Sequence, residues 1–265
     1  MLHKSTALDP GPNGFSNPLG RVARASAYKM ASLLPTNWLE WMRGKSMLRD
    51  VLNTLSIDCV IDVGANRGQY GLTLRGLGYA KDIISFEPVE SNLESLRKTA
   101  ARNQPWRVFP YALGNTDGSA EINVTTNTVF SSLLTPDDES RSRFPANRTD
   151  RRETVEIRRL ENVLEECLRG IAASRLYLKL DTQGFDLEVL RGAASVLPRV
   201  LALQTEVSFR SIYHAMHDFT ESIAEFRACG FEVVDFLPGV RDIDHLSAIE
   251  MDCIMARRPQ WGVRH

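Results

Sequence analysis

Carboxylates that directly follow apolar runs are the residues of this sequence best suited to chemistry. Asp181 follows the run LYLKL, and Glu206 follows the run LALQT. If the two runs are neighbouring parallel strands, about 4.8 Å apart, both carboxylates lie at one edge of the sheet. Two such groups either repel, which raises one pKa until that group can act as a base, or jointly hold a hard cation such as Mg²⁺. Asp181 and Glu206 are therefore candidate catalytic residues and candidate metal ligands, although the sequence shows no third carboxylate ligand.

Two histidines follow the second of these runs. The segment SIYHAMHDF contains His214 and His217, shortly after the second run. A neutral imidazole is a good general base. His214 is the candidate catalytic base of the two, and the alternative is that a loop histidine has no role.

A glycine-bearing turn, VIDVGANRGQYG (60–71), runs from an apolar strand into a helix. Glycine lets the backbone approach a ligand closely, and the first N–H groups of the helix face that ligand. A tight turn without a ligand is the alternative. The dinucleotide fingerprint needs glycines at positions one, three and six, but counting from Gly64 the third and sixth residues are Asn66 and Gln69. This mismatch disfavours an NAD-type cofactor.

Two later strand ends add candidate cofactor contacts. Glu87, in SFEP, follows the last glycine of the turn by about 20 residues, where a carboxylate can accept both ribose hydroxyls. A surface ion pair is the alternative for Glu87. Ala112, in YALGNTDG, can flank an adenine. The full set of predicted cofactor-binding residues is Asp62, Gly64, Asn66, Gly68, Tyr70, Glu87, Pro88, Ala112 and Asp181.

The elements that must position these residues alternate along the chain. Strands are predicted at 59–63, 82–86, 107–110, 176–180 and 201–205, with helices near 69–77, 90–102, 160–169 and 186–195. Strands that are apolar on both faces and separated by helices require a parallel sheet covered on both sides. After a helix near 218–229, the runs FEVVDFL and DCIMARR predict an antiparallel hairpin. The predicted fold class is α/β, a doubly wound, mostly parallel, Rossmann-like seven-stranded sheet ending in that hairpin.

Three segments make up the predicted domain organisation. Residues 1–20, rich in proline and glycine, are expected to form a flexible arm, and residues 21–56 a helical extension. Apolar residues recur at helical spacing in that extension, as in a helix docked on the domain or a lid over a lipid-like acceptor. The main domain is expected at 57–258, with an insertion at about 118–160 that contains an extra strand pair and a polar loop. The loop either carries function or is disordered.

Composition excludes several classes of protein. The 265 residues, 43% hydrophobic and 25% charged, fit one globular core, and a net charge of −1 disfavours a nucleic-acid partner. Four cysteines far apart in sequence suit reduced thiols and a cytoplasmic location. The N-terminal residues lack a signal peptide's apolar core, and no apolar run is long enough for a transmembrane segment. The sequence does not decide whether the chain forms a homodimer.

The motifs taken together resemble the FkbM-like methyltransferases. These are class I S-adenosylmethionine-dependent enzymes that mostly methylate hydroxyls of sugars, glycolipids and polyketide-like products. The resemblance covers about residues 57–257 and rests on VIDVGANRGQYG, SFEP, ALGNTDGSAEI, SSL, VEIRRLENVL, LKLDTQGFDLEVLRGA and LQTEVSF. It implies S-adenosylmethionine as the cofactor, with the turn from Asp62 to Gly68 around its methionine end. The family usually reads Asp-x-Glu-Gly where this chain has Asp181, Thr182, Gln183 and Gly184, so position 183 lacks the usual acid.

The same resemblance implies a small-molecule or glycan acceptor, methylated on a hydroxyl of a sugar, oligosaccharide or glycolipid. The Asn/Asp-Pro-Pro-Tyr/Phe signature of many amino-group methyltransferases is absent, which favours oxygen over nitrogen as the acceptor atom. Alternatives are a nucleotide-dependent oxidoreductase on the same fold and a catalytically inactive cofactor-binding module. The aromatic residues that either stack on sugar rings or pack in the core are Trp38, Trp41, Phe130, Phe144 and Tyr213.

Overall fold

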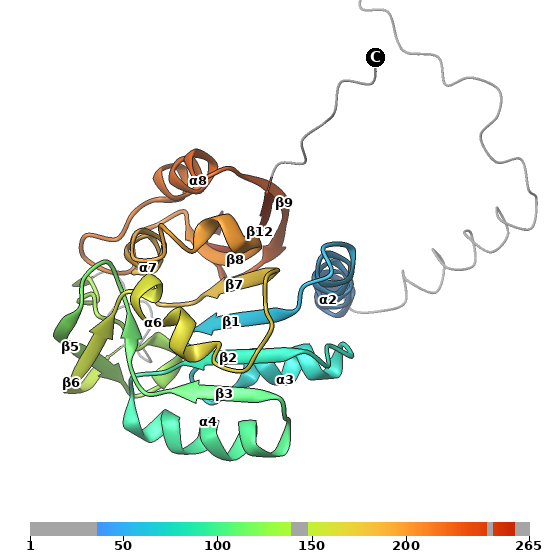
Figure 1. Ribbon diagram of the computed structural model, residues 1–265. Coiled ribbons are helices and arrows are strands. Elements are labelled where there is room, and N and C mark those ends of the chain that lie inside the picture. Colours follow the sequence, from blue (N-terminus) through green and yellow to red (C-terminus); the bar gives the residue numbers. More distant parts are fainter. Residues whose placement is uncertain (1–35, 139–147, 243–245, 258–265) are drawn as a thin grey trace, which may run out of the picture. The chain divides into compact units, whose positions relative to one another are not determined.

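The computed structural model describes residues 36–138, 148–242 and 246–257 (Figure 1). The chain divides into two compact units, Met1–Arg43 and Gly44–His265, and the sheet and the candidate site belong to the second. The predicted arm at 1–20, residues 21–35 of the predicted extension, and Phe144 lie outside the described residues, and the rest of the extension contains helix α2 (Thr36–Thr54).

One seven-stranded sheet forms the centre of the second unit. Its strand order is β3-β2-β1-β7-β8-β12-β9, and all neighbours are parallel except that β12 runs antiparallel to both β8 and β9. The predicted doubly wound α/β fold with an antiparallel C-terminal hairpin is confirmed. The strands are β1 (Cys59–Val63), β2 (Asp82–Phe86), β3 (Trp106–Phe109), β7 (Leu176–Leu180), β8 (Val200–Ser208), β9 (Phe231–Pro238) and β12 (Glu250–Arg257).

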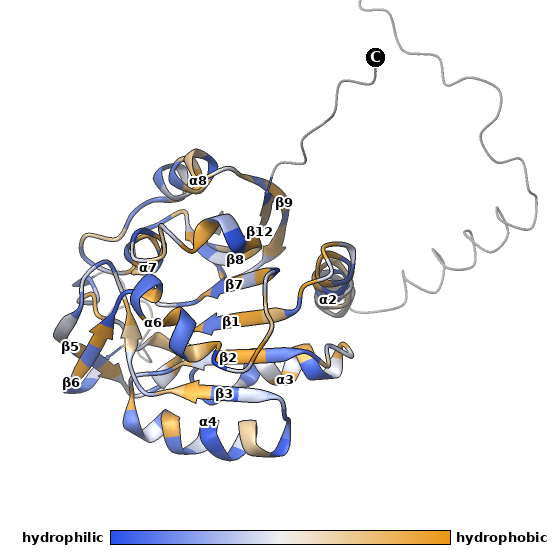
Figure 2. Cartoon of the chain, in the orientation of Figure 1, coloured by the Kyte–Doolittle hydropathy of each residue, from blue (hydrophilic) through white to orange (hydrophobic). Residues whose placement is uncertain are grey.

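Helices cover both faces of this sheet because its central strands are apolar on both sides (Figure 2). Buried residues of α2, α3 (Gln69–Gly76) and α4 (Glu90–Arg102) belong to the cluster on one face. Buried residues of α6 (Leu160–Cys167), α7 (Asp186–Arg191) and α8 (Phe219–Ala228) belong to the cluster on the other. Leu48, Val51 and Leu52 of α2 are buried, so this part of the helix is docked rather than free as a lid.

The insertion forms a second, three-stranded sheet of order β4-β6-β5. The predicted strand pair is β5 (Gly118–Thr125) and β6 (Thr149–Arg158), which run antiparallel, and β4 (Ala112–Leu113) adds a parallel strand that the sequence analysis did not predict. A short 3₁₀ turn, η1 (Thr128–Phe130), follows β5. Residues 139–147 of the predicted polar loop lie outside the described residues.

Smaller elements complete the second unit. In the chain between β9 and β12, β10 (Arg241–Asp242) and β11 (Ser247–Ala248) form a two-stranded pair. The 3₁₀ turn η3 (Leu197–Arg199) precedes β8. None of the helices in the described part of the chain combines the length and apolar character needed to cross a membrane.

Candidate functional site

The turn after β1 places backbone, rather than side chains, at the carboxyl ends of the parallel strands. Gly64, Asn66 and Gly68 all have positive φ angles, of 77°, 49° and 92°. Glycine adopts this left-handed region freely, whereas Asn66 is one of the few residue types that tolerate it. The N–H groups of Gly64 and Ala65 donate to the carbonyl oxygen of Phe86 at 3.0 and 3.1 Å. The turn is therefore bonded to the end of β2, where Glu87 follows.

Glu87 is buried, 4% exposed, and is held by the turn that it adjoins. Its Oε2 accepts from the Asn66 N–H at 2.7 Å, and its Oε1 accepts from the Val89 N–H at 2.9 Å and the Asn92 amide at 3.4 Å. Burial raises the pKa of Glu87 to about 7, and these three hydrogen bonds oppose the shift. Glu87 is thus a carboxylate whose charge changes near neutral pH.

Asp62, on β1, lies beneath the same turn. It is 1% exposed, and its Oδ2 accepts from the Ser85 hydroxyl at 2.9 Å, whose oxygen accepts in turn from the Trp106 indole N–H at 2.9 Å. Burial raises the pKa of Asp62 to about 6 against the opposing effects of Ser85 and Lys179. These bonds fix the carboxylate between β1, β2 and β3.

Asp62, the turn after β1 and Glu87 line one cavity of about 330 Å³. All of the predicted cofactor-binding residues line it except Gly68, which lies one residue before the helix α3. The predicted set thus meets at one place, and its contact with a cofactor stays a prediction. The cavity is also lined by residues for which no site role was predicted, Phe185 and the residues of the inserted segment Ile122, Thr128, Val129, Ser131, Ser132 and Leu133.

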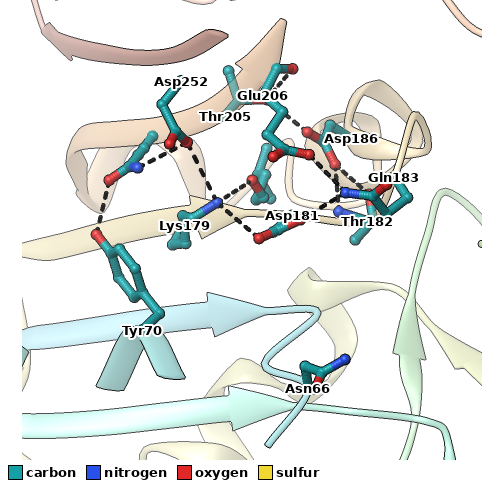
Figure 3. A network of polar contacts seen from close by, with 12 residues as sticks. Asn66, Tyr70, Lys179, Asp181, Thr182, Gln183, Asp186, Thr205, Glu206 and Asp252 are labelled. Atoms are coloured by element: carbon teal, nitrogen blue, oxygen red, sulfur yellow. Dashed lines mark hydrogen bonds and ion pairs between the residues drawn. The ribbon is translucent and has the colours of Figure 1, made fainter. Parts of the chain in front are cut away.

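Asp181, at the end of β7, joins the cavity to a network of polar side chains (Figure 3). Lys179 Nζ lies 3.3 Å from Asp181 Oδ2 and 3.8 Å from Asp252 Oδ1. The amide of Gln183 donates to Asp181 Oδ1 at 3.2 Å and to Glu206 Oε2 at 2.7 Å. The predicted carboxylate pair is therefore close in space, but Gln183 lies between its members, and Glu206 does not line the cavity.

Lys179 and its partners form the part of the site that the sequence analysis missed. Lys179 is 4% exposed, and although burial favours the neutral amine, the combined attraction of nearby carboxylates, Asp181 and Asp252 first, outweighs it and raises the pKa of Lys179. Gln204 donates to Asp252 at 2.9 Å and accepts from the hydroxyl of Tyr70 at 3.0 Å. The sequence signal was a lone lysine in an apolar strand, because a buried lysine needs an acidic partner.

Glu206 and Glu250 add two buried carboxyl groups to this region. Burial, with repulsion from Asp181 and Glu250, raises the pKa of Glu206 well above its ordinary value. Burial and the Asp181 charge raise the pKa of Glu250 to about 7, against the Ser208 hydroxyl, which donates to Glu250 at 2.9 Å. Two nearby carboxyls therefore hold protons near neutral pH more readily than free ones.

Among the predicted residues that the structure describes, His214, His217, Phe130 and Tyr213 do not line the cavity. His214 is exposed and is fixed by its backbone N–H, which donates to the Thr135 carbonyl at 2.8 Å, and His217 pairs with Glu221. Tyr213 is fully buried, with its hydroxyl 2.9 Å from Gln183 Oε1, so it packs in the core. The side chains of Trp38 and Trp41 are outside the described residues.

The predicted Mg²⁺ ligands do not form a metal site as they stand. Both candidate ligands, Asp181 and Glu206, accept from the same amide group, and an N–H donor cannot coordinate a cation. Within the described ranges, no group of three or more His, Cys, Asp or Glu side chains is arranged to hold a metal ion. The residues present thus fit a hydrogen-bonded pair better than a bound cation.

A family model described as "Methyltransferase FkbM domain" matches residues 62–233, well over half of the chain. The match runs from Asp62 into β9, so it includes every strand end that lines the cavity.

A curated relative from Sordaria araneosa, named "Methyltransferase sdnD", is 27% identical over 164 residues. The match covers 54% of this chain and 63% of the relative, so this chain spans less than two thirds of the relative's length.

Two solved methyltransferase structures match this chain at low identity and with TM-scores below 0.5. An rRNA methylase from Streptococcus thermophilus matches with a TM-score of 0.42 and 11% identity, over 80% of this chain and 94% of that one. Magnesium protoporphyrin IX methyltransferase from Synechocystis PCC 6803, solved with bound SAM, matches with a TM-score of 0.44 and 10% identity, over 83% of this chain and 81% of that one.

Proposed function

Because the chain belongs to the family of FkbM methyltransferase domains, we propose that it is an S-adenosylmethionine-dependent O-methyltransferase acting on a hydroxyl of a sugar, oligosaccharide or glycolipid. One observation carries the proposal: the glycine turn after β1, Glu87 after β2 and Asp181 after β7 line a single cavity. In open α/β sheets the ligand lies at the carboxyl ends of the strands where the strand order reverses, here between β1 and β7.

Different residues of the cavity match the ribose, the adenine and the methionine part of this cofactor. Glu87, at the end of β2, can accept hydrogen bonds from both ribose hydroxyls once it is ionised. Ala112 and Leu113 offer an apolar surface to the adenine, and the turn from Gly64 to Asn66 offers backbone to the methionine end. When bound, S-adenosylmethionine supplies a methyl group on a positively charged sulfur, and Asp62 and Asp181 contribute negative charge near it.

We assign proton removal from the acceptor hydroxyl to Asp181. Methyl transfer needs the acceptor oxygen in line with the methyl carbon and needs its proton removed. Asp181 lines the cavity, and Lys179 and Gln183 fix its two oxygens. Glu206 acts on Asp181 indirectly, because both carboxyl groups accept from the Gln183 amide. His214 is exposed and does not line the cavity, so we give it no part in this step.

The acceptor, the location and the domain limits are parts of the same proposal. The missing Asn/Asp-Pro-Pro-Tyr/Phe signature supports oxygen as the acceptor atom, and the resemblance to FkbM-like enzymes supports a sugar. The four free cysteines suit a reducing compartment such as the cytoplasm. The domain is proposed to span residues 57–258, with the insertion at about 118–160 contributing the cavity lining at 128–133.

The test is transfer of a labelled methyl group from S-adenosylmethionine to a panel of glycans and glycolipids, with and without EDTA. Labelled product that survives EDTA is the expected result. Binding of NAD(H) without binding of S-adenosylhomocysteine would instead support an oxidoreductase. Binding of S-adenosylhomocysteine with no transfer to any acceptor class, amines included, would support an inactive cofactor-binding module.

A further inference from the structure

The side chain of Gln183 is buried, 5% exposed, yet each of its polar atoms has a partner (Figure 3). Its Nε2 donates to Asp181 Oδ1 at 3.2 Å and to Glu206 Oε2 at 2.7 Å, while its Oε1 lies 2.9 Å from the Tyr213 hydroxyl. An amide nitrogen has two hydrogens, so its donor capacity is fully used by the two carboxylates.

The backbone of Gln183 is held as firmly as its side chain. Its φ angle is 54°, in the left-handed region, which costs a non-glycine residue about 1–2 kcal/mol. Its carbonyl oxygen accepts from the Ser132 hydroxyl at 2.7 Å, and the Tyr213 hydroxyl also lies 3.0 Å from the Phe130 carbonyl. Backbone strain of this kind persists where surrounding contacts over-determine it, and such residues cluster at functional sites. The inserted segment and the segment after β8 thus fix Gln183 together.

The partners of the amide determine which way it faces. With nitrogen toward Asp181 and Glu206, two N–H groups meet two acceptors. With the amide reversed, its carbonyl oxygen would meet the oxygens of both carboxyl groups, an arrangement that repels unless Glu206 carries a proton or a cation lies among the three groups. Lys179 already supplies positive charge to the other oxygen of Asp181, at 3.3 Å. The first orientation needs no further ion.

We propose that Gln183 is a positioning residue whose side-chain amide bridges Asp181 and Glu206 in place of a divalent cation and holds the Asp181 carboxylate toward the cavity. The bridge follows from the contacts of Gln183, whereas the task of Asp181 at the acceptor rests on the proposed function. An acid at position 183 would bring three carboxylates together, and such a group repels itself when empty and suits a hard cation when filled.

Calorimetric titration of Mg²⁺ alone into the wild-type chain, Gln183→Glu and Gln183→Leu tests the bridge. We expect no saturable binding to the wild type up to millimolar Mg²⁺, saturable binding to Gln183→Glu, and none to Gln183→Leu. The leucine control keeps a similar size and removes both donors without adding charge. Saturable Mg²⁺ binding to the wild type would overturn the proposal, and this arm does not depend on any variant folding.

The affinity for S-adenosylhomocysteine tests the positioning role. Both substitutions are expected to weaken binding about tenfold, since each removes hydrogen bonds to a carboxylate of the cavity. Mg²⁺ should restore binding in Gln183→Glu and not in Gln183→Leu, a difference that general structural damage would not produce. Wild-type affinity in Gln183→Glu without Mg²⁺ would overturn the proposal. If the wild type does not bind S-adenosylhomocysteine, the proposed function fails, and the Mg²⁺ titration alone still decides the bridge.

Discussion

The backbone of Asp181 runs so close to Gly64 that a methyl group added to Gly64 would lie 1.9 Å from the Asp181 carbonyl oxygen. The Asp181 N–H also donates to the Val63 carbonyl at 3.1 Å, so the contact joins backbone to backbone. No side-chain rotation can relieve a clash there. The turn after β1 and Asp181 after β7 can therefore lie this close together only because residue 64 is glycine.

Replacing Gly64 with Ala is expected to destabilise the fold by at least about 3 kcal/mol and to abolish binding of S-adenosylhomocysteine. The clash forces the turn away from β7, and the positive φ of 77° adds strain. Chemical denaturation and calorimetry measure the two effects.

Gly78→Ala is the matched control for that substitution. Gly78 also has a positive φ, 85°, but a Cβ there meets no atom within 4 Å. We expect a loss of about 1 kcal/mol from backbone strain and unchanged cofactor affinity. Equal effects of the two substitutions would show that strain, and not the approach to Asp181, makes Gly64 necessary.

The affinity for S-adenosylhomocysteine should depend on pH through Glu87. Burial raises the pKa of this carboxyl to about 7, so the free protein holds it protonated below that pH, whereas the ribose hydroxyls need the ionised form. As pH falls from 7 to 5.5, we expect affinity to fall by up to about tenfold per pH unit. Above pH 8 it should level off. Titration calorimetry across this range measures the slope.

Glu87→Gln separates this effect from other titrations. The substituted amide keeps the size of the side chain but has no proton to exchange, so we expect weaker binding with a flatter pH profile. In this variant, ionisation of Asp62, whose pKa is about 6, would leave a smaller pH dependence of the affinity, centred about one pH unit lower. A wild-type affinity that is constant from pH 5.5 to 8 would remove Glu87 from the cofactor site.

Glu250→Gln should stabilise the folded chain at pH 8 and leave its stability unchanged at pH 4. The pKa of Glu250 is raised from 4.5 to about 7, first by burial, so the folded state binds its proton more tightly than the unfolded state does. Stability is therefore lost as pH rises from 4.5 to 7, and the substitution removes a cost of about 3 kcal/mol above that range. Glutamine keeps an acceptor for Ser208.

Urea denaturation at the two pH values measures this difference, and Glu121→Gln is the control. Glu121 lies on β5 with 65% of its side chain exposed, so its substitution should change stability by less than about 0.5 kcal/mol at either pH. If Glu250→Gln stabilised the chain equally at pH 4 and pH 8, ionisation of Glu250 would not be the cause.

Much of this fold was predictable because its strands are short and apolar on both faces. The predicted limits of β1, β2 and β7 coincide with the observed ones. β4, at Ala112–Leu113, was missed because it has two residues and exists only by pairing with β6, a contact that no local pattern encodes.

The site was predictable to the extent that it follows strand ends. Asp62, Glu87 and Asp181 meet in one cavity because parallel strands bring their carboxyl ends to one edge. The position of Gln183 was not predictable, since its φ of 54° depends on contacts from Ser132 and Tyr213, distant in sequence. Sequence spacing placed Asp181 and Glu206 at one edge of the sheet but could not show the Gln183 amide between them.

Asp181→Asn and His214→Ala should separate the two candidate bases once an acceptor is identified. Asp181 lines the cavity, whereas His214 is exposed and outside it. We expect Asp181→Asn to lower kcat by about 10²-fold or more, the usual contribution of a general base. His214→Ala should leave kcat within about twofold. Steady-state kinetics with labelled methyl groups measure both, and a loss in His214→Ala as large as that in Asp181→Asn would place the base on the loop after β8.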